Sequence, residues 1–252
     1  MASLHDRVGI VTGSSSGIGA ATARALAAEG MTVVLAARRL ERLSAVADTI
    51  RAEGGRAEVA EFDLRDEASV DALVDSTVQW HGRLDALVNN AAMGILRRIE
   101  DGDTAEWRAV VETNVLGTLA ACRAALRHML PRGSGDLVNM TSVSAFEAWP
   151  YLGVYAGSKA AVHAFSNSLR AEVGGRGIRV MTMQVHGIAT EFAAGFDPQA
   201  LETAGKRWVD LGLLNREAEV IDPAHVGRTI AFMLAQPPSV SLHDVTLRPR
   251  NN

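Results

Sequence analysis

The stretch VGIVTGSSSGIG, residues 8 to 19, decides the fold. Its first five residues are mostly apolar and β-branched and predict a buried strand, and the glycines that follow open a helix. Such a turn lets backbone N–H groups approach a pyrophosphate at the positive end of the helix. The spacing is G-x-x-x-G-x-G, and a plain strand-to-helix turn is the competing interpretation. Its place after the first strand favours nucleotide binding, with contacts at Gly13, Ser15, Ser16, Gly17, Ile18 and Gly19.

Beyond this turn, short apolar runs alternate with longer segments that carry apolar residues at helical spacing. The predicted strands are Val8 to Thr12, Thr32 to Ala36, Ala57 to Phe62, Ala86 to Asn89, Asp136 to Met140, Ile178 to Gln184 and His243 to Leu247. The predicted helices are Ile18 to Glu29, Leu40 to Glu53, Glu67 to Trp80, Thr104 to Leu130 and Val154 to Val173. This alternation predicts one α/β domain over residues 1–252, a Rossmann-type doubly wound parallel sheet with helices on both faces.

Composition narrows the class of protein. The chain has 252 residues, of which 48% are hydrophobic, and a formal net charge of −4. That charge provides no basic field for nucleic acid, so no nucleic-acid partner is expected. Cys122 is the only cysteine, which excludes an internal disulfide, and the histidines lack the spacing of metal ligands. Without a long apolar run or an apolar leader, the chain is expected to be cytoplasmic, with no membrane partner and no metal.

The end of the second predicted strand should decide which dinucleotide binds. Sites for NAD place a carboxylate about 20 residues beyond the glycine-rich turn, where it bonds the ribose 2′-hydroxyl. Here the sequence instead has Arg38 and Arg39, whose guanidinium groups suit a 2′-phosphate. The alternative is that both are solvated residues at the start of a helix. Their distance from the glycine-rich turn favours phosphate binding, so NADP(H) is the expected cofactor.

Tyr155 and Lys159 are four residues apart and share one face of a predicted helix. A phenol of pKa about 10 needs roughly 4 kcal/mol to reach a pKa near 7. Two unit charges about 4 Å apart interact by about 4 kcal/mol at an effective dielectric of about 20. One ammonium beside the phenol is therefore sufficient before desolvation is subtracted. By chance alone, a Y-x-x-x-K pair is more often a surface tyrosine with a solvated lysine.

Two further polar residues support the pair. Ser142 follows the strand Asp136 to Met140, where its hydroxyl can hold a carbonyl oxygen beside Tyr155. Asn114 lies within a long predicted helix, which it can interrupt, and it can carry a water that relays protons to Lys159. Either residue alone would be an ordinary polar group of a helix or loop.

In these residues the chain resembles the short-chain dehydrogenase/reductase family, with motifs in family order along nearly the whole sequence: the glycine-rich turn, Asp63, Asn89-Asn90-Ala91, Asn114, Ser142, Tyr155 and Lys159. The resemblance implies a catalytic tetrad of Asn114, Ser142, Tyr155 and Lys159. It also implies cofactor contacts at Asp63, Leu64, Asn90, Ala91, Ile188 and Thr190. Hydride transfer on the B face of nicotinamide and a homotetramer or homodimer are implied too. The stretch from Ala37 to Leu43 and the ending TLRP look similar to a branch with clavulanate dehydrogenase and hydroxy-acid dehydrogenases.

The sequence departs from the family pattern at two places. Ala92 stands where the family has glycine, and its methyl group narrows the space near the nicotinamide. His186 stands where the family has proline, so the loop loses a fixed φ and gains a donor and a titratable ring. Either the loop simply tolerates His186, or the ring faces the substrate and bonds a polar group on it.

The segment 191–219 breaks the strand–helix rhythm and is expected to cover a substrate. Candidate substrate contacts are Ser144, Trp149, His186 and Phe192, with Phe146, Leu152, Phe196 and Trp208 as further wall residues or plain core residues. The sequence thus predicts an NADPH-dependent reductase of a ketone or aldehyde, acting reversibly on a secondary alcohol, with a role in secondary metabolism as one setting. The alternative function is a sensor or scaffold that binds NADP(H) without turnover.

Overall fold

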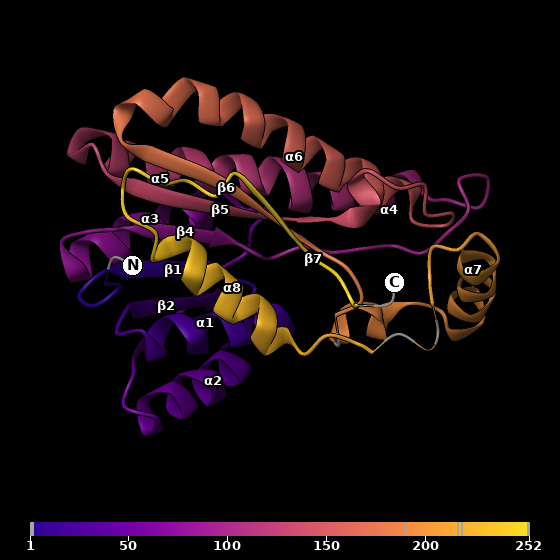
Figure 1. Cartoon of the computed structure of the whole chain (residues 1–252), viewed down its shortest axis with the longest axis horizontal. Coiled ribbons are helices and arrows are strands. Elements are labelled where there is room, and N and C mark those ends of the chain that lie inside the picture. The colour runs from indigo at the N-terminus through magenta and orange to yellow at the C-terminus, as the bar shows by residue number, and fades with distance from the viewer. Residues whose placement is uncertain (1–2, 189, 216, 218, 251–252) are drawn as a thin grey trace.

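A seven-stranded parallel sheet forms the centre of the molecule (Figure 1). The computed structural model describes residues 3–188, 190–215, 217 and 219–250. The strand order across the sheet is β3-β2-β1-β4-β5-β6-β7. The strands are β1 Val8–Thr12, β2 Thr32–Ala37, β3 Arg56–Glu61, β4 Ala86–Asn89, β5 Gly135–Ser142, β6 Ile178–Val185 and β7 Asp244–Leu247. The order reverses between β1 and β4, and ligands of doubly wound sheets bind at such a switch point.

Helices cover both faces of the sheet, as Figure 1 shows. One apolar core packs α1, α2 and α8 against one face, and a second packs α3, α5 and α6 against the other. The helices are α1 Gly17–Ala28, α2 Leu40–Ala52, α3 Glu67–His81, α4 Thr104–Val111, α5 Thr118–Arg132, α6 Gly153–Val173, α7 Pro198–Asp210 and α8 Pro223–Leu234. Burial on both faces explains why the strands are continuous apolar runs. The predicted fold class is confirmed, with element bounds shifted by one or two residues.

One predicted helix, Thr104 to Leu130, is not a regular α-helix. A π-helical segment, η1 (Glu112–Gly117), separates α4 from α5. The predicted interruption at Asn114 is confirmed, because Asn114 lies inside this segment. The whole helical run, Thr104–Arg132, is long and apolar enough to cross a membrane, although by length and composition only. In the structure α5 packs against α3 and the sheet, as a core helix does.

The segment 191–219 contains a short 3-10 turn, η4 (Glu191–Gly195), and the helix α7. Asp197 begins α7 by accepting a hydrogen bond from the Ala200 N–H, and Pro198 suits the first helical position. Trp208 of α7 packs in a third apolar cluster with Trp149 and Leu152. The segment therefore lies against the loop that follows β5, beyond the carboxyl end of that strand.

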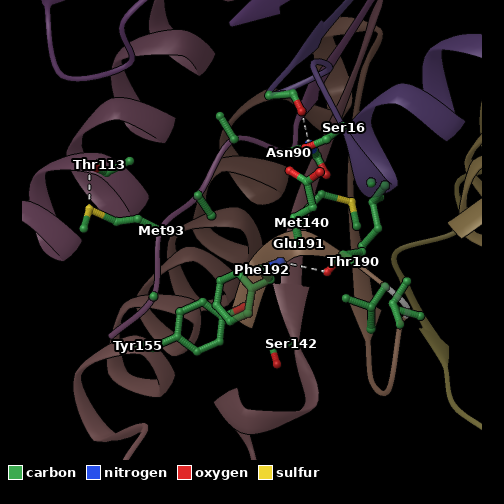
Figure 2. Close-up of a pocket in the computed structure, with 18 of the residues that line it drawn as sticks. Ser16, Asn90, Met93, Thr113, Met140, Ser142, Tyr155, Thr190, Glu191 and Phe192 are labelled. Carbon is green, nitrogen blue, oxygen red and sulfur yellow. Dashed lines mark hydrogen bonds between the residues drawn. The ribbon is translucent and has the colours of Figure 1, made fainter. Parts of the chain in front are cut away.

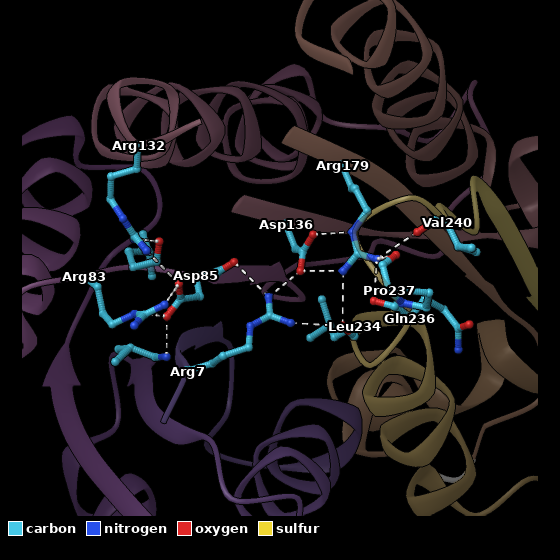
Figure 3. Close-up of polar contacts among 12 residues, drawn as sticks. Arg7, Arg83, Asp85, Arg132, Asp136, Arg179, Leu234, Gln236, Pro237 and Val240 are labelled. Carbon is cyan, nitrogen blue, oxygen red and sulfur yellow. Dashed lines mark hydrogen bonds and ion pairs between the residues drawn. The ribbon is translucent and has the colours of Figure 1, made fainter. Parts of the chain in front are cut away.

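Ion pairs fill the opposite, amino end of the sheet (Figure 3). Asp136, at the start of β5, accepts from Arg179 Nε at 2.6 Å and also pairs with Arg7. Asp85, just before β4, accepts from Arg83 Nε at 2.7 Å and from Arg132 at 3.1 Å. Both carboxylates are buried, and each pairs with two guanidinium groups that balance its negative charge.

Candidate active site

A cavity of about 1150 Å³ lies at the carboxyl ends of the strands (Figure 2). Gly19 and Asn114 are the two proposed site residues that do not line it. The other proposed cofactor and catalytic residues line it: Gly13, Ser15, Ser16, Gly17, Ile18, Arg38, Arg39, Asp63, Leu64, Asn90, Ala91, Ser142, Tyr155, Lys159, Ile188 and Thr190. So do the candidate substrate residues Ser144, Trp149, His186 and Phe192. Residues from across the chain therefore meet in one cavity.

The glycine-rich turn is packed too closely for side chains. Gly13 has φ +67°, and a Cβ there would lie 2.8 Å from Ala91 Cα. A Cβ on Gly19 would lie 2.3 Å from the Gly13 carbonyl oxygen, which places Gly19 behind the turn. A Cβ on Gly17 would lie 3.2 Å from Thr190 Cγ2. The turn thus keeps its backbone bare toward the cavity at the start of α1, as a pyrophosphate requires.

Thr12 and Asn90 join the turn to the loop after β4. The Asn90 side chain donates to the Thr12 carbonyl oxygen at 2.9 Å. The backbone N–H groups of Asn90 and Ala91 both donate to Thr12 Oγ1 at 3.0 Å. The sequence placed Thr12 at the start of the glycine-rich motif but predicted no role for its side chain. Its hydroxyl positions the two loops that wall the cavity.

Four charged residues gather where the 2′-phosphate is expected. Arg39 donates to Ser15 Oγ at 2.9 Å, and Arg38 is exposed beside it. Arg42 and Glu191 line the same wall and were not predicted. The Arg42 Nη1 to Glu191 Oε2 distance is 2.7 Å, and Arg39 Nη1 is 3.8 Å from the same oxygen. Arg42 lies in the first turn of the helix that directly follows Arg38 and Arg39, which is a signal in the sequence, whereas nothing in the sequence points to Glu191.

Asp63 and Leu64 lie at the far end of the cavity. Asp63 accepts from the Arg65 backbone N–H at 3.0 Å and pairs with the Arg65 guanidinium at 3.2 Å. The hydrogen bond from Arg65 holds the pKa of Asp63 below its usual value. Leu64 packs against Gly117 of η1, where a Cβ would lie 2.4 Å from Leu64 Cγ. An ionised acceptor and an apolar surface are thus available together at this end.

Tyr155 and Lys159 lie on α6, and Ser142 is the last residue of β5. Figure 2 shows Tyr155 and Ser142 in the same pocket. Burial raises the pKa of Tyr155 to about 12, and a hydrogen bond with Ser142 acts in the opposite direction. Burial lowers the pKa of Lys159 to about 8. Lys159 Nζ donates to the Met140 carbonyl oxygen at 2.9 Å and lies 5.8 Å from the centre of the Tyr155 ring.

The sequence predicted that one ammonium is sufficient to bring the pKa of Tyr155 toward 7 before desolvation is subtracted. In the structure desolvation is the largest influence on this phenol, and its pKa is raised. At neutral pH Tyr155 is a protonated phenol and Lys159 is a cation.

Asn114 is almost fully buried and lies behind Tyr155 and Lys159. Its Oδ1 accepts from the Met93 N–H at 2.9 Å, and its Nδ2 donates to the Met93 carbonyl oxygen at 2.8 Å. Nδ2 also donates to Ser158 Oγ at 2.9 Å, and Ser158 donates to the Tyr155 carbonyl oxygen at 2.7 Å. Asn114 therefore connects the loop after β4 to the first turns of α6.

Aromatic rings form the wall beyond Tyr155. The Phe192 and Tyr155 ring centroids are 5.0 Å apart, and a Cβ on Gly94 would lie 2.3 Å from Phe192 Cζ. His186 is buried with its ring 5.0 Å from that of Trp149. Leu152 also lines the cavity.

Three of the expected wall residues do not line the cavity. Phe196 and Trp208 pack behind its wall. Phe146 was expected to shape the cavity but does not, since it is 57% exposed and packs against His163 outside it.

Comparison with known proteins identifies the family. The chain belongs to the short chain dehydrogenase family, whose model matches residues 7–200. It is 34% identical over 250 residues to an uncharacterized oxidoreductase of Staphylococcus saprophyticus, which covers 99% of this chain and 100% of the relative. A metagenomic short-chain oxidoreductase solved in complex with NADP has a TM-score of 0.82 at 28% identity, covering 98% of this chain and 99% of that chain. An actinorhodin polyketide ketoreductase variant with NADPH has a TM-score of 0.82 at 27% identity, covering 99% and 98%. This chain is therefore an oxidoreductase of that family.

Proposed function

We propose that the protein is an NADPH-dependent reductase that converts a ketone or aldehyde to an alcohol. The observation that carries the proposal is the meeting of Ser142, Tyr155 and Lys159 in the same cavity as the bare glycine-rich turn. A nicotinamide dinucleotide bound there supplies the hydride. A module that only bound the dinucleotide would have no use for a protonated phenol and an ammonium at the end of that cavity.

The polar side chains divide the remaining chemistry among them. Ser142 orients the carbonyl oxygen toward Tyr155 by hydrogen bonding. Tyr155, with its pKa raised to about 12, holds its proton at neutral pH and passes it to the oxygen as negative charge develops there. An alkoxide is more basic than a phenolate, so this transfer is downhill. Lys159 then offsets the charge left on the phenol oxygen.

Three observations support NADP(H) as the cofactor. Arg38 and Arg39 follow β2 where an NAD site needs a carboxylate. Both line the cavity that begins at the glycine-rich turn. Two similar structures contain NADP or NADPH. The residues present therefore fit a dinucleotide that carries a 2′-phosphate.

The segment 191–219 is proposed to cover the substrate, since Phe192 lies against Tyr155 and α7 supports the aromatic wall. The helical run Thr104–Arg132 is proposed to join copies of the chain into a tetramer. Val111, Leu116 and Leu119 are exposed apolar residues on that run. Light scattering coupled to gel filtration tests the assembly, and a monomer would contradict it.

Tyr155→Phe tests the reductase assignment, and Tyr151→Phe is the matched control because these are the two tyrosines of the chain. Removing the proton donor should lower kcat by about 100-fold or more with a panel of cyclic ketones and aldehydes, followed by loss of NADPH absorbance. NADPH affinity, measured by fluorescence titration, should stay near that of the wild type. The control should keep its activity, because Tyr151 faces Arg98 outside the cavity. Full turnover by Tyr155→Phe would contradict the proposal.

A further inference from the structure

The substrate end of the cavity is connected to the last residues of the chain by Glu147 and Arg248. Arg248 directly follows β7 and forms an ion pair with Glu147, which lies in the loop after β5. The other carboxylate oxygen of Glu147, Oε2, accepts from Trp149 Nε1 at 3.2 Å. Neither charged residue lines the cavity, whereas Trp149 does. The ion pair therefore contacts the wall from behind.

Trp149 is the central ring of this wall. Its centroid lies 5.0 Å from that of His186 and 5.2 Å from that of Trp208, with interplanar angles of 74° and 67°. All three side chains are buried. Trp208 is held in turn by a hydrogen bond from its Nε1 to the Pro150 carbonyl oxygen at 2.8 Å. Edge-to-face packing against both rings and the hydrogen bond from its Nε1 to Glu147 hold Trp149 in this orientation.

The wall carries no net charge toward the cavity. Burial lowers the pKa of His186, the Arg248 charge lowers it further, and Glu147 acts in the opposite direction, so the imidazole is neutral at pH 7. Glu147 and Arg248 neutralise one another. Together with Leu152 and Phe192, these side chains give the cavity an uncharged, largely apolar wall near Tyr155. Such a wall matches an uncharged apolar group of the substrate better than a carboxylate.

We infer that Glu147 and Arg248 are positioning residues that fix Trp149 in the wall of the cavity, and that the substrate is a carbonyl compound bearing a large uncharged apolar group that packs against this wall. The inference rests on the proposed reductase function and adds the substrate class to it. A purely structural role does not account for the arrangement, because the two side chains are 28% and 39% exposed and such pairs contribute little to stability.

The test compares Glu147→Ala, Arg248→Met and Arg248→Lys with two probes, acetophenone and propanal. Acetophenone offers a large apolar group to the wall that contains Trp149, and propanal offers a much smaller one. Loss of the hydrogen bond to Trp149 in Glu147→Ala should raise KM for acetophenone about fivefold with kcat nearly unchanged. KM for propanal and the Kd of NADPH should not change. Arg248→Met should raise KM for acetophenone less than Glu147→Ala does, and Arg248→Lys should keep the wild-type KM.

Equal changes in KM for both probes, or no change for acetophenone, would overturn the inference while leaving the reductase assignment intact. If the wild type reduces neither probe nor any other carbonyl of the panel with NADPH, the reductase assignment itself fails. The two failures are thus distinguishable.

A second measurement needs no turnover. Two indoles 5.2 Å apart couple in the far-ultraviolet circular dichroism spectrum, and Trp208→Phe identifies that signal by removing it. Glu147→Ala should weaken the signal, and Arg248→Lys should retain it. An unchanged signal in folded Glu147→Ala would show that the carboxylate does not orient Trp149, and would overturn the positioning role.

Discussion

The two ends of the sheet use charge in opposite ways. At the amino end, the buried carboxylates of Asp85 and Asp136 each meet two guanidinium groups, as Figure 3 shows. Burial alone would raise the pKa of Asp85, but hydrogen bonds from Arg83, the Val8 N–H and Arg132 outweigh it, so the pKa is lowered. At the carboxyl end, Lys159 is buried with a carbonyl oxygen as its hydrogen-bond acceptor, and burial lowers its pKa to about 8.

The difference separates stability from function. Charges at the amino end are matched, and removing one partner leaves another buried and unpaired. The charge of Lys159 at the carboxyl end faces a cavity and is kept at a cost in stability, as is common for groups at functional sites. Substitutions at the two ends should therefore have opposite effects on folding.

The largest effect is expected at the amino end from Asp136→Ala. It leaves Arg7 and Arg179 without their shared carboxylate and should lower the free energy of unfolding by about 3–5 kcal/mol. Urea unfolding followed by circular dichroism measures the loss, and NADPH binding by the folded fraction should persist. Asp48→Ala is the control, since its exposed pair with Arg51 should contribute under about 1 kcal/mol. Equal losses in the two variants would refute the special role of the amino end.

At the carboxyl end, Lys159→Met should abolish turnover yet raise the free energy of unfolding by up to about 3 kcal/mol at pH 7. The pKa of this lysine is 10.5 in the unfolded chain and about 8 in the folded one. Between those values the unfolded chain binds more protons, so wild-type stability gains a contribution as pH rises from about 8 to 10.5. The variant should lack this gain. Urea unfolding at pH 7 and pH 9 measures both effects, and a less stable variant would count against the burial argument.

Cofactor binding distinguishes the arginines of the cavity from those elsewhere. Arg38→Ala combined with Arg39→Ala should weaken NADPH binding by tens of fold and NADH binding much less, because the two charge-assisted contacts are to the 2′-phosphate. Arg24→Ala is the control, since Arg24 pairs with Glu53 outside the cavity. Fluorescence titration gives both dissociation constants. Similar losses for the two dinucleotides would exclude a 2′-phosphate contact at these residues.

The smallest effect is expected from Glu191→Gln. Its carboxylate forms an ion pair with Arg42 and lies near Arg39. It therefore competes with the anionic cofactor for these guanidinium groups. Its removal should tighten NADPH binding about threefold at low salt, with the gain shrinking as salt screens the charges. Glu202→Gln is the matched control, because Glu202 also lies in the segment 191–219 but pairs with Lys206. Weaker binding in Glu191→Gln would mean that Glu191 holds the arginines in place for the cofactor.

The order of strands and helices can be predicted from this sequence because it depends on local patterns. Apolar runs identified β1 and β4 with their observed bounds, and the glycine-rich turn identified the start of α1. The sequence also predicted that Tyr155 and Ser142 lie close together. Ser142 lies at the end of a predicted strand, and Tyr155 lies near the start of a predicted helix. Those features depend on near neighbours in the chain.

Contacts between distant segments could not be predicted. Arg42 and Glu191 are 149 residues apart, and their pairing depends on how the segment after β6 folds back. The outward position of Phe146 and the connection of Arg248 to Glu147 depend on tertiary packing in the same way. The extent of desolvation at Tyr155 could not be predicted either, because it is set by how much water the folded cavity excludes, which no spacing reveals.

Because of the π-helical segment around Asn114, the number of residues between α4 and α5 matters as well as their identity. Each residue of an α-helix turns the next by about 100°. Deleting one residue between Glu112 and Gly117 would let the run wind as a regular α-helix with α4 and α5 close to their present positions, but the widened turn that contains Asn114 would be lost. Asn114 would then lose its paired hydrogen bonds with the backbone of Met93. At this position an insertion or deletion should be harder to tolerate than most substitutions.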